Sequence, residues 1–107
     1  PERIKVFKVP PRVIIDNQAS ATHTVIEVNG RDRPGFLYLV TRALFGLSLQ
    51  ISSAKISTFG ERAVDVFYVK DGFGMKVTHD SRLTKIREAL LDAIREDDGA
   101  SARAAAE

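Results

Sequence analysis

The spacing of the apolar residues changes twice from the two-residue period of strands to the three-and-four spacing of helices, and this order constrains the fold most. Strand-like segments are expected at 24–30, 49–59 and 63–69. Helical spacing follows the first of these segments and also the third. The order strand, helix, strand, strand, helix is that of a β-α-β-β-α-β sandwich that lacks its last strand.

A short apolar run at 13–15 supplies a replacement for the missing strand. Turn-forming polar residues separate it from segment 24–28, and the loop is short enough for a hairpin. A hairpin partner from the N-terminal side would occupy the edge where the last strand normally lies. We therefore predict an α+β, ferredoxin-like sandwich with an antiparallel sheet and two helices on one face. Another alternating segment at 3–9, which ends before Pro10 and Pro11, is also expected to be a strand.

The helix boundaries are predicted from caps and proline. Pro34 suits the first helical position, because its missing N–H costs nothing there, and Asp32 then lies at or next to the N-cap. The second helix is expected to be capped by Asp80 or Ser81. The stripes predicted to be buried are Leu37, Val40, Leu44 and Leu47 in the first helix, and Leu83, Ile86, Leu90 and Ile94 in the second.

Segment 63–69 is apolar on both faces, which is typical of a central strand or of one whose second face meets a partner. Segment 49–59 alternates poorly and is expected to contain a bulge or to form an edge. One assignment of faces would bury Asp65, and a lone carboxylate resists burial, so we favour the other. Under this prediction Val64, Val66 and Tyr68 face the helices, while Val25, Phe67 and Val69 form an exposed apolar face suited to an interface.

Composition excludes several classes of function. The chain has no cysteine, which removes disulfides and thiolate chemistry and fits a reducing, cytoplasmic location. No apolar run approaches the roughly 18 residues of a membrane span. The net charge is +2, from interleaved charges, and does not call for a nucleic-acid partner.

The 107 residues suggest one domain. We expect an N-terminal strand and linker at 1–22, the domain at 23–96 and a flexible tail at 97–107. Because the chain begins at Pro1, without an initiator methionine or a signal-peptide pattern, we also expect it to be part of a longer protein.

The sequence contains no recognisable catalytic constellation. His79 and Asp80 resemble a metal-binding pair, but most catalytic metals need about three protein ligands, so capping by Asp80 is the favoured interpretation. His23 has no candidate partner, and phosphate-loop and nucleophile motifs are missing. We expect no catalytic residue, no metal site and no cofactor in this chain.

The start of the first helix is the best candidate for a binding site. Helix N-termini attract anions, and Gly35 has no side chain to block an approach to the backbone. The amides of Gly35, Phe36 and Leu37 could hold a carboxylate while Asp32 holds an ammonium group, which together suit a zwitterion. The alternative is a plain helix start, in which Asp32 only caps.

These residues also carry a family resemblance. Segment 24–28, followed by DRPGFL at 32–37, resembles the start of an ACT domain. The continuation at 54–69 and the segment at 9–13 are similar to the C-terminal ACT domain of bacterial bifunctional uridylyltransferase/uridylyl-removing enzymes. The resemblance extends over about 7–94. ACT domains have a ferredoxin-like fold and often sense amino acids.

The resemblance implies a regulatory role in nitrogen metabolism. Such enzymes uridylylate a PII signal protein with UTP when glutamine is scarce and remove the group hydrolytically when it is abundant. The implied chemistry, with its magnesium, belongs to catalytic domains outside this chain. The implied ligand is glutamine, and its contacts would come from the loop that runs from Gly30 to Leu37 and from Gln50, often where two chains meet.

Partners implied by the resemblance are the parent enzyme's other domains, PII as its substrate, and a second copy of the chain through the sheet face or an edge. A rival interpretation is an interaction module that binds no ligand. An RNA-binding sheet is disfavoured, because such sheets need exposed aromatics on adjacent strands with basic neighbours, and only Phe67 is available.

Overall fold

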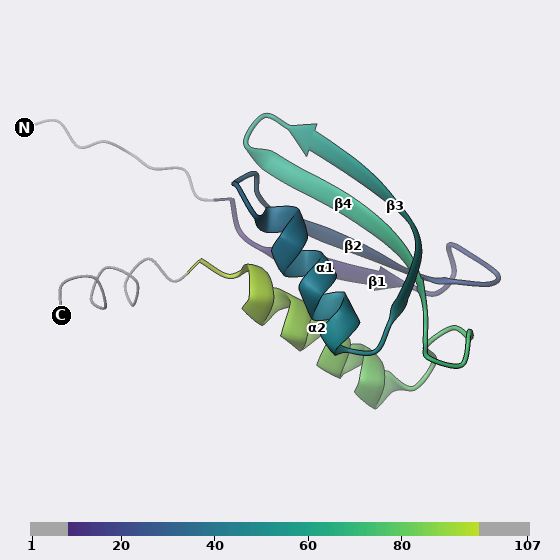
Figure 1. The fold of residues 1–107 in the computed structure, drawn as a ribbon. Helices are drawn as coiled ribbons and strands as arrows, with labels where there is room; N and C mark the ends of the chain where they lie inside the picture. Colours follow the sequence, from purple (N-terminus) through teal and green to yellow (C-terminus); the bar gives the residue numbers. More distant parts are fainter. Residues whose placement is uncertain (1–8, 97–107) are drawn as a thin grey trace, which may run out of the picture.

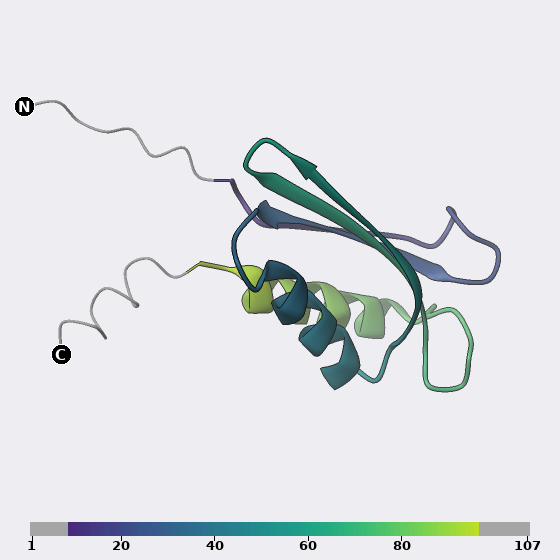
Figure 2. The same ribbon diagram turned by 45° about the horizontal axis from the view of Figure 1, so that its top comes forward.

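The structure is a computed structural model that describes residues 9–96. Four strands form one antiparallel sheet in the order β1-β2-β4-β3, and both helices cover the same face of it (Figures 1 and 2). This confirms the predicted ferredoxin-like class. The elements are β1 (Arg12–Asp16), β2 (Thr24–Arg31), α1 (Phe36–Gly46), β3 (Gln50–Phe59), β4 (Arg62–Lys70) and α2 (Asp80–Ile94).

The N-terminal strand takes the place of the missing last strand, as predicted. β1 pairs antiparallel with β2, with Val13 opposite Val28 and Ile15 opposite Ile26. Except for Val9, the strand expected at 3–9 lies outside the described residues, as does the tail expected at 97–107. None of the helices within 9–96 is long and apolar enough to cross a membrane.

The strands at the other edge of the sheet also agree with the prediction from the sequence. β4 is central, and β3 is an edge strand whose register shifts between Ile51 and Ser53, which confirms the expected irregularity. Gly60 has a left-handed φ of 61° in the tight turn between β3 and β4, where glycine is favoured. One side of the ten-residue strand β3 pairs with β4, and its outer edge has no partner strand within the described chain.

The predicted assignment of faces on β4 was wrong. Phe67 and Val69 are fully buried against the helices, and Asp65 is buried with them. Val25 is paired with Tyr68 and Ile26 with Phe67, so Val25 and Phe67 lie on opposite faces. Burying a large apolar side chain contributes about 1.5–3 kcal/mol, and several such groups together outweigh one desolvated carboxylate. The half-buried residues on the open face of β4 are Val64, Val66 and Tyr68.

Both predicted helix starts also need correction. Phe36 N–H donates to the carbonyl of Arg33 over 3.1 Å, and Gly35 has φ 82° and ψ −1°. Pro34 and Gly35 are therefore the central residues of a type II turn, and α1 begins after them. Gly35 occupies the N-cap without a side-chain hydrogen bond, so Asp32 does not cap the helix. In α2 the N-cap is His79 rather than Asp80 or Ser81.

The later start of α1 changes its buried stripe. Phe36 takes the inward position that was predicted for Leu37, and Leu37 is 43 % exposed. The Phe36 ring lies directly over Gly30, where an added Cβ would be 2.5 Å from the nearest ring carbon. The helical residues that are fully inside are Phe36, Val40 and Leu44 in α1, and Ile86, Leu90 and Ile94 in α2.

Candidate functional site

A cavity of about 360 Å³ lies where the start of α1 meets the end of β3 and the first half of β4. This volume is within the usual range of small-molecule sites, roughly 300–1,000 Å³. The cavity brings together four residues predicted from the sequence, Asp32, Gly35, Phe36 and Leu37. The other residues that line it are Arg33, Tyr38, Ile56, Thr58, Ala63 and Asp65.

The loop that forms one wall of the cavity is anchored by its neighbours. Asp32 N–H donates to the carbonyl of Glu61 over 2.7 Å, which ties the loop to the β3–β4 turn. Arg33 reaches the end of α2, where its guanidinium contacts the Glu96 carboxylate at 3.1 Å and the Ile94 carbonyl at 3.3 Å. These contacts hold the loop in place before any ligand binds.

The predicted site residues have different roles in the structure. The Asp32 side chain is exposed at the cavity and performs no capping. The Phe36 amide is already paired with Arg33, so it is not available for a carboxylate. Gly30 is buried beneath the Phe36 ring and supports the loop.

Gln50 lies away from the cavity within one chain. It is at the first position of β3, opposite Lys70, whereas the cavity is lined by Ile56 and Thr58 near the other end of the strand. Its amide Nε2 donates to the carbonyls of Asp71 and Gly72 over 3.2 and 3.4 Å. A single chain therefore does not bring Gln50 together with Asp32.

Asp65 is the residue that sequence reasoning missed. It lies on the helix-facing side of β4, between Val28 of β2 and Ile56 of β3, and is 2 % exposed. Its Oδ1 atom has no hydrogen-bond partner among the described residues. The available signal was a carboxylate in line with Phe67 and Val69 on one face of the strand.

The cavity has an acidic character. Burial raises the pKa of Asp65, a backbone hydrogen bond with Ser57 opposes this, and the nearby Asp32 carboxylate raises the pKa further. Arg33 is the one basic residue among the described cavity-lining residues, and its guanidinium is directed to α2. Two carboxylates that no cation among the described lining residues separates favour a ligand that carries positive charge.

The raised pKa of Asp65 gives a prediction about stability. A carboxyl group whose folded pKa lies above its ordinary value of 3.8 makes folding less favourable as pH rises from 3.8 through the folded pKa. Asp65→Asn removes this cost. We expect the variant to be the more stable protein at pH 7, with the difference vanishing as the pH falls below about 3.8. Urea unfolding of both proteins between pH 3 and 7 measures it, and a variant that is less stable at pH 7 would contradict it.

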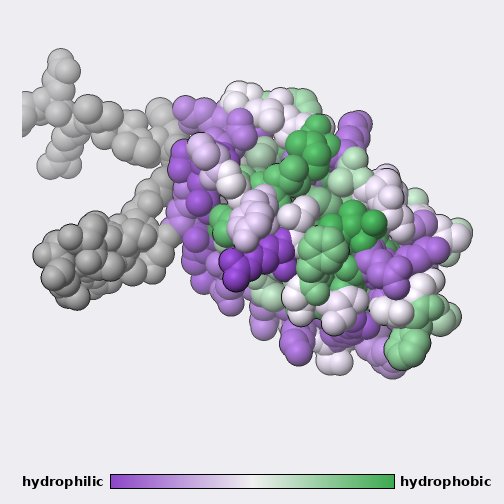
Figure 3. All heavy atoms as spheres, viewed as in Figure 1, coloured by the Kyte–Doolittle hydropathy of each residue, from purple (hydrophilic) through white to green (hydrophobic). Residues whose placement is uncertain are grey.

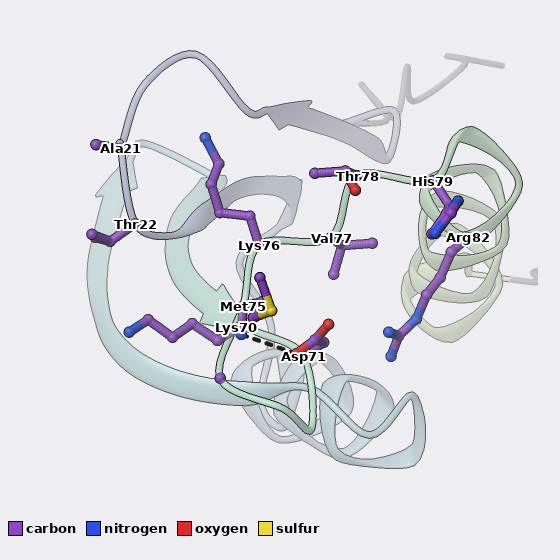
Figure 4. A pocket seen from close by; sticks show the side chains of 11 residues that line it. Ala21, Thr22, Lys70, Asp71, Met75, Lys76, Val77, Thr78, His79 and Arg82 are labelled. Atoms are coloured by element: carbon purple, nitrogen blue, oxygen red, sulfur yellow. Dashed lines mark hydrogen bonds between the residues drawn. The ribbon is translucent and has the colours of Figure 1, made fainter.

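A second cavity, of about 630 Å³, lies at the other end of β4. It carries several basic residues, but Figure 4 shows that Lys70 and Lys76 point apart and that Arg82 is directed toward Asp71. The Nζ atom of Lys76 donates to two carbonyls of the β1–β2 loop, over 2.5 and 2.7 Å. The basic groups do not converge on one point, so the cavity at the start of α1 is the better candidate site.

The fold and this loop-to-helix cavity are those of a small regulatory domain. Residues 19–97 match the model of the ACR family N-terminal ACT domain, and the chain belongs to the ACT domain family. A crystal structure of an unknown protein from Galdieria sulphuraria has a TM-score of 0.53 with 23 % identity, covering 65 % of this chain and 37 % of that one. At this identity the likeness supports the fold alone.

Relatives point to one kind of ACT domain. The chain is 73 % identical over 92 residues to the bifunctional uridylyltransferase/uridylyl-removing enzyme of Azospirillum brasilense. It is 69 % identical over 94 residues to the enzyme of the same name from Rhodospirillum rubrum. These matches cover 86 % and 88 % of the chain but 10 % of each relative. The chain is thus a regulatory ACT domain of the kind found in these enzymes, and it spans about a tenth of their length.

Proposed function

We propose that this domain senses glutamine on behalf of a bifunctional uridylyltransferase/uridylyl-removing enzyme. The observation that carries the proposal is the acidic cavity at the start of α1, where Asp32 and Asp65 lie beside the N-terminal end of a helix. Carboxylates suit an ammonium group, and a helix N-terminus favours a carboxylate by about 0.3–1 kcal/mol. An α-amino acid carries both groups on one carbon atom.

The proposal extends to the whole enzyme. The parent enzyme would uridylylate a PII signal protein with UTP when glutamine is scarce, and it would remove the uridylyl group when glutamine is abundant. The catalytic domains, which would hold magnesium, lie outside this chain, and the enzyme works in the cytoplasm. The support is the high identity to enzymes of that name over most of the chain.

A second copy of the chain would lie next to the site. If two β3 edges pair antiparallel about the middle of the strand, Gln50 of one copy lies opposite Phe59 of the other, on the sheet face away from the helices, and Ile51 lies opposite the cavity-lining Thr58. In this arrangement Gln50 would lie beside the site, on the other face of the sheet, rather than in the cavity. Apolar residues near this edge also favour association, and Figure 3 shows apolar side chains gathered where α1 lies beside β3. The exposed ones are Leu37, Tyr38 and Phe45 of α1 and Ile56 of β3.

The association through β3 gives a testable prediction. We expect the 107-residue chain to form dimers at high concentration and Ala54→Pro to shift it toward monomer, because proline removes an N–H from the exposed strand edge. Sedimentation equilibrium measures the change. The matched control is Ile14→Pro on β1, the opposite edge, which should leave the dimer intact. A wild-type chain that stays monomeric at high concentration would argue against this association.

Blocking the cavity should weaken glutamine binding. Thr58 is exposed, lines the cavity and lies on a strand, so Thr58→Trp fills the space while keeping a residue that strands favour. We expect calorimetric titration to show glutamine binding to the wild-type chain and at least about a tenfold loss in Thr58→Trp, which corresponds to about 1.4 kcal/mol. Gly35→Val is a poorer test, because the left-handed φ of Gly35 would strain a valine.

The control for this titration is Ser53→Trp. Ser53 is exposed on the same strand but pairs with Tyr68, on the sheet face away from the helices. The Ser53→Trp variant should bind glutamine with the affinity of the wild type. Equal binding by wild type and Thr58→Trp would place the glutamine site elsewhere.

A second candidate function is an interaction module that binds no amino acid. The exposed apolar residues of α1 and β3 favour it, because such a surface could pack against other domains of the parent enzyme. The same titration separates the two functions. Heat for glutamine alone among the amino acids supports sensing, whereas no heat for any of them supports the interaction module.

A further inference from the structure

We propose that Asp65 is the ammonium-binding residue of this cavity, a buried carboxylate that obtains its missing partner only when an α-amino acid binds. The inference rests on the proposed function and deepens it, because it names a specificity-determining group in the floor of the site. Asp32, at the exposed rim, then has a secondary part.

The first step of the argument is the missing partner. Buried polar atoms in folded proteins nearly always have hydrogen-bond partners, and a buried carboxylate oxygen without one is costly. Oδ1 of Asp65 is such an atom: it has no partner in the described chain, and the residue is buried, with 2 % exposure. The Asp65 carboxylate has a backbone hydrogen bond with Ser57, which leaves Oδ1 unpaired in this part of the chain. The surrounding cavity is large enough to admit a small molecule.

The second step is that the neighbouring residues do not provide a cation. The charge of Asp32 acts on Asp65, and it has the same sign. The Arg33 guanidinium is engaged by Glu96 and by the Ile94 carbonyl. The register places apolar Val28 and Ile56 on either side of Asp65. A donor with positive charge must therefore come from outside these residues.

The third step is access and orientation. Leu37 and Ile56 line the cavity and are 43 % and 51 % exposed, so their side chains can move aside with little loss of packing. The first turn of α1 lines the same cavity as Asp65. An amino acid could therefore direct its ammonium group to Asp65 and its carboxylate to the end of the helix. This pairing selects zwitterions over simple anions, which two carboxylates would repel.

The test compares Asp65→Asn with the wild-type 107-residue chain. L-Glutamine, each of the other nineteen amino acids and glutaramate, which is glutamine without its amino group, are titrated by calorimetry. In parallel, the carboxyl carbon of Asp65 is followed by NMR in chain labelled with ¹³C-aspartate. We expect the amino acid that binds to lose about tenfold or more in affinity in Asp65→Asn, because a charge-assisted hydrogen bond is removed. It should also shift the Asp65 signal.

Asp92→Asn is the matched control, because Asp92 is exposed on α2. This variant should bind the amino acid as the wild type does. Glutaramate should bind at least about tenfold more weakly than glutamine. The inference is overturned if the amino acid that binds has the same affinity for Asp65→Asn, or if glutaramate binds as tightly as glutamine; glutamine sensing would survive either result.

The remaining outcomes are also decisive. If another amino acid binds and depends on Asp65, the role of Asp65 stands and the glutamine proposal fails. If no amino acid binds the wild-type chain, both fail. A merely structural role for Asp65 would lower the melting temperature of Asp65→Asn at pH 7, whereas the inferred role predicts an increase together with lost binding.

Discussion

Phe67→Ala is expected to lower the free energy of unfolding by about 3–5 kcal/mol, the range for removing a fully buried phenylalanine. Phe67 lies at the middle of the central strand, pairs with Ile26 on β2 and Ala54 on β3, and has no exposed surface. Small domains are stable by only about 5–15 kcal/mol, so this change would remove a large share of the total. Urea unfolding followed by circular dichroism measures it.

The control is the next residue along β4. Tyr68 is half-buried on the face of the sheet away from the helices, so Tyr68→Ala should cost clearly less. If Phe67→Ala does not fold, Phe67→Leu retains most of the volume and should show a smaller loss, still measurable by urea. A larger effect at Tyr68 than at Phe67 would mean that the strand presents its other face to the helices.

Gly30→Ala is expected to destabilise the domain by about 1–3 kcal/mol, the usual cost of overpacking a core. The added Cβ would lie 2.5 and 2.9 Å from two ring carbons of Phe36, and Phe36 is itself buried at the start of α1. The ring must shift, and the shift moves the loop that forms one wall of the cavity. We therefore expect weaker amino-acid binding together with the loss of stability.

Two further variants test this explanation. Phe36→Leu removes the clashing ring atoms, so the double variant should cost less than the sum of the single changes, by about 0.5 kcal/mol or more. Gly46→Ala, at the end of α1, meets nothing within 4 Å and has no left-handed φ, so it should be neutral or slightly stabilising. Additive losses at Gly30 and Phe36 would contradict the proposed contact.

The site was only partly predictable for a physical reason. The DRPGFL stretch identified the loop because proline and glycine restrict the backbone locally, and the structure places Asp32, Gly35, Phe36 and Leu37 around one cavity. The sequence did not distinguish a helix cap from a type II turn, because Asp, Pro and Gly favour both. The structure forms the turn, and its closing hydrogen bond pairs the Phe36 amide with the Arg33 carbonyl.

What the sequence determined by itself was the order and type of the elements, and with them the replacement of the last strand by β1. Periodicity and turn chemistry are local properties, so they can be recognised from neighbouring residues. Tertiary structure decided which face of β4 is inside, because both faces are apolar and the choice depends on the summed burial of β2, β4 and the two helices. That choice buried Asp65, left its Oδ1 atom without a partner among residues 9–96 and so created the acidic cavity. The cost of one desolvated carboxylate was smaller than the gain from burying Phe67 and Val69.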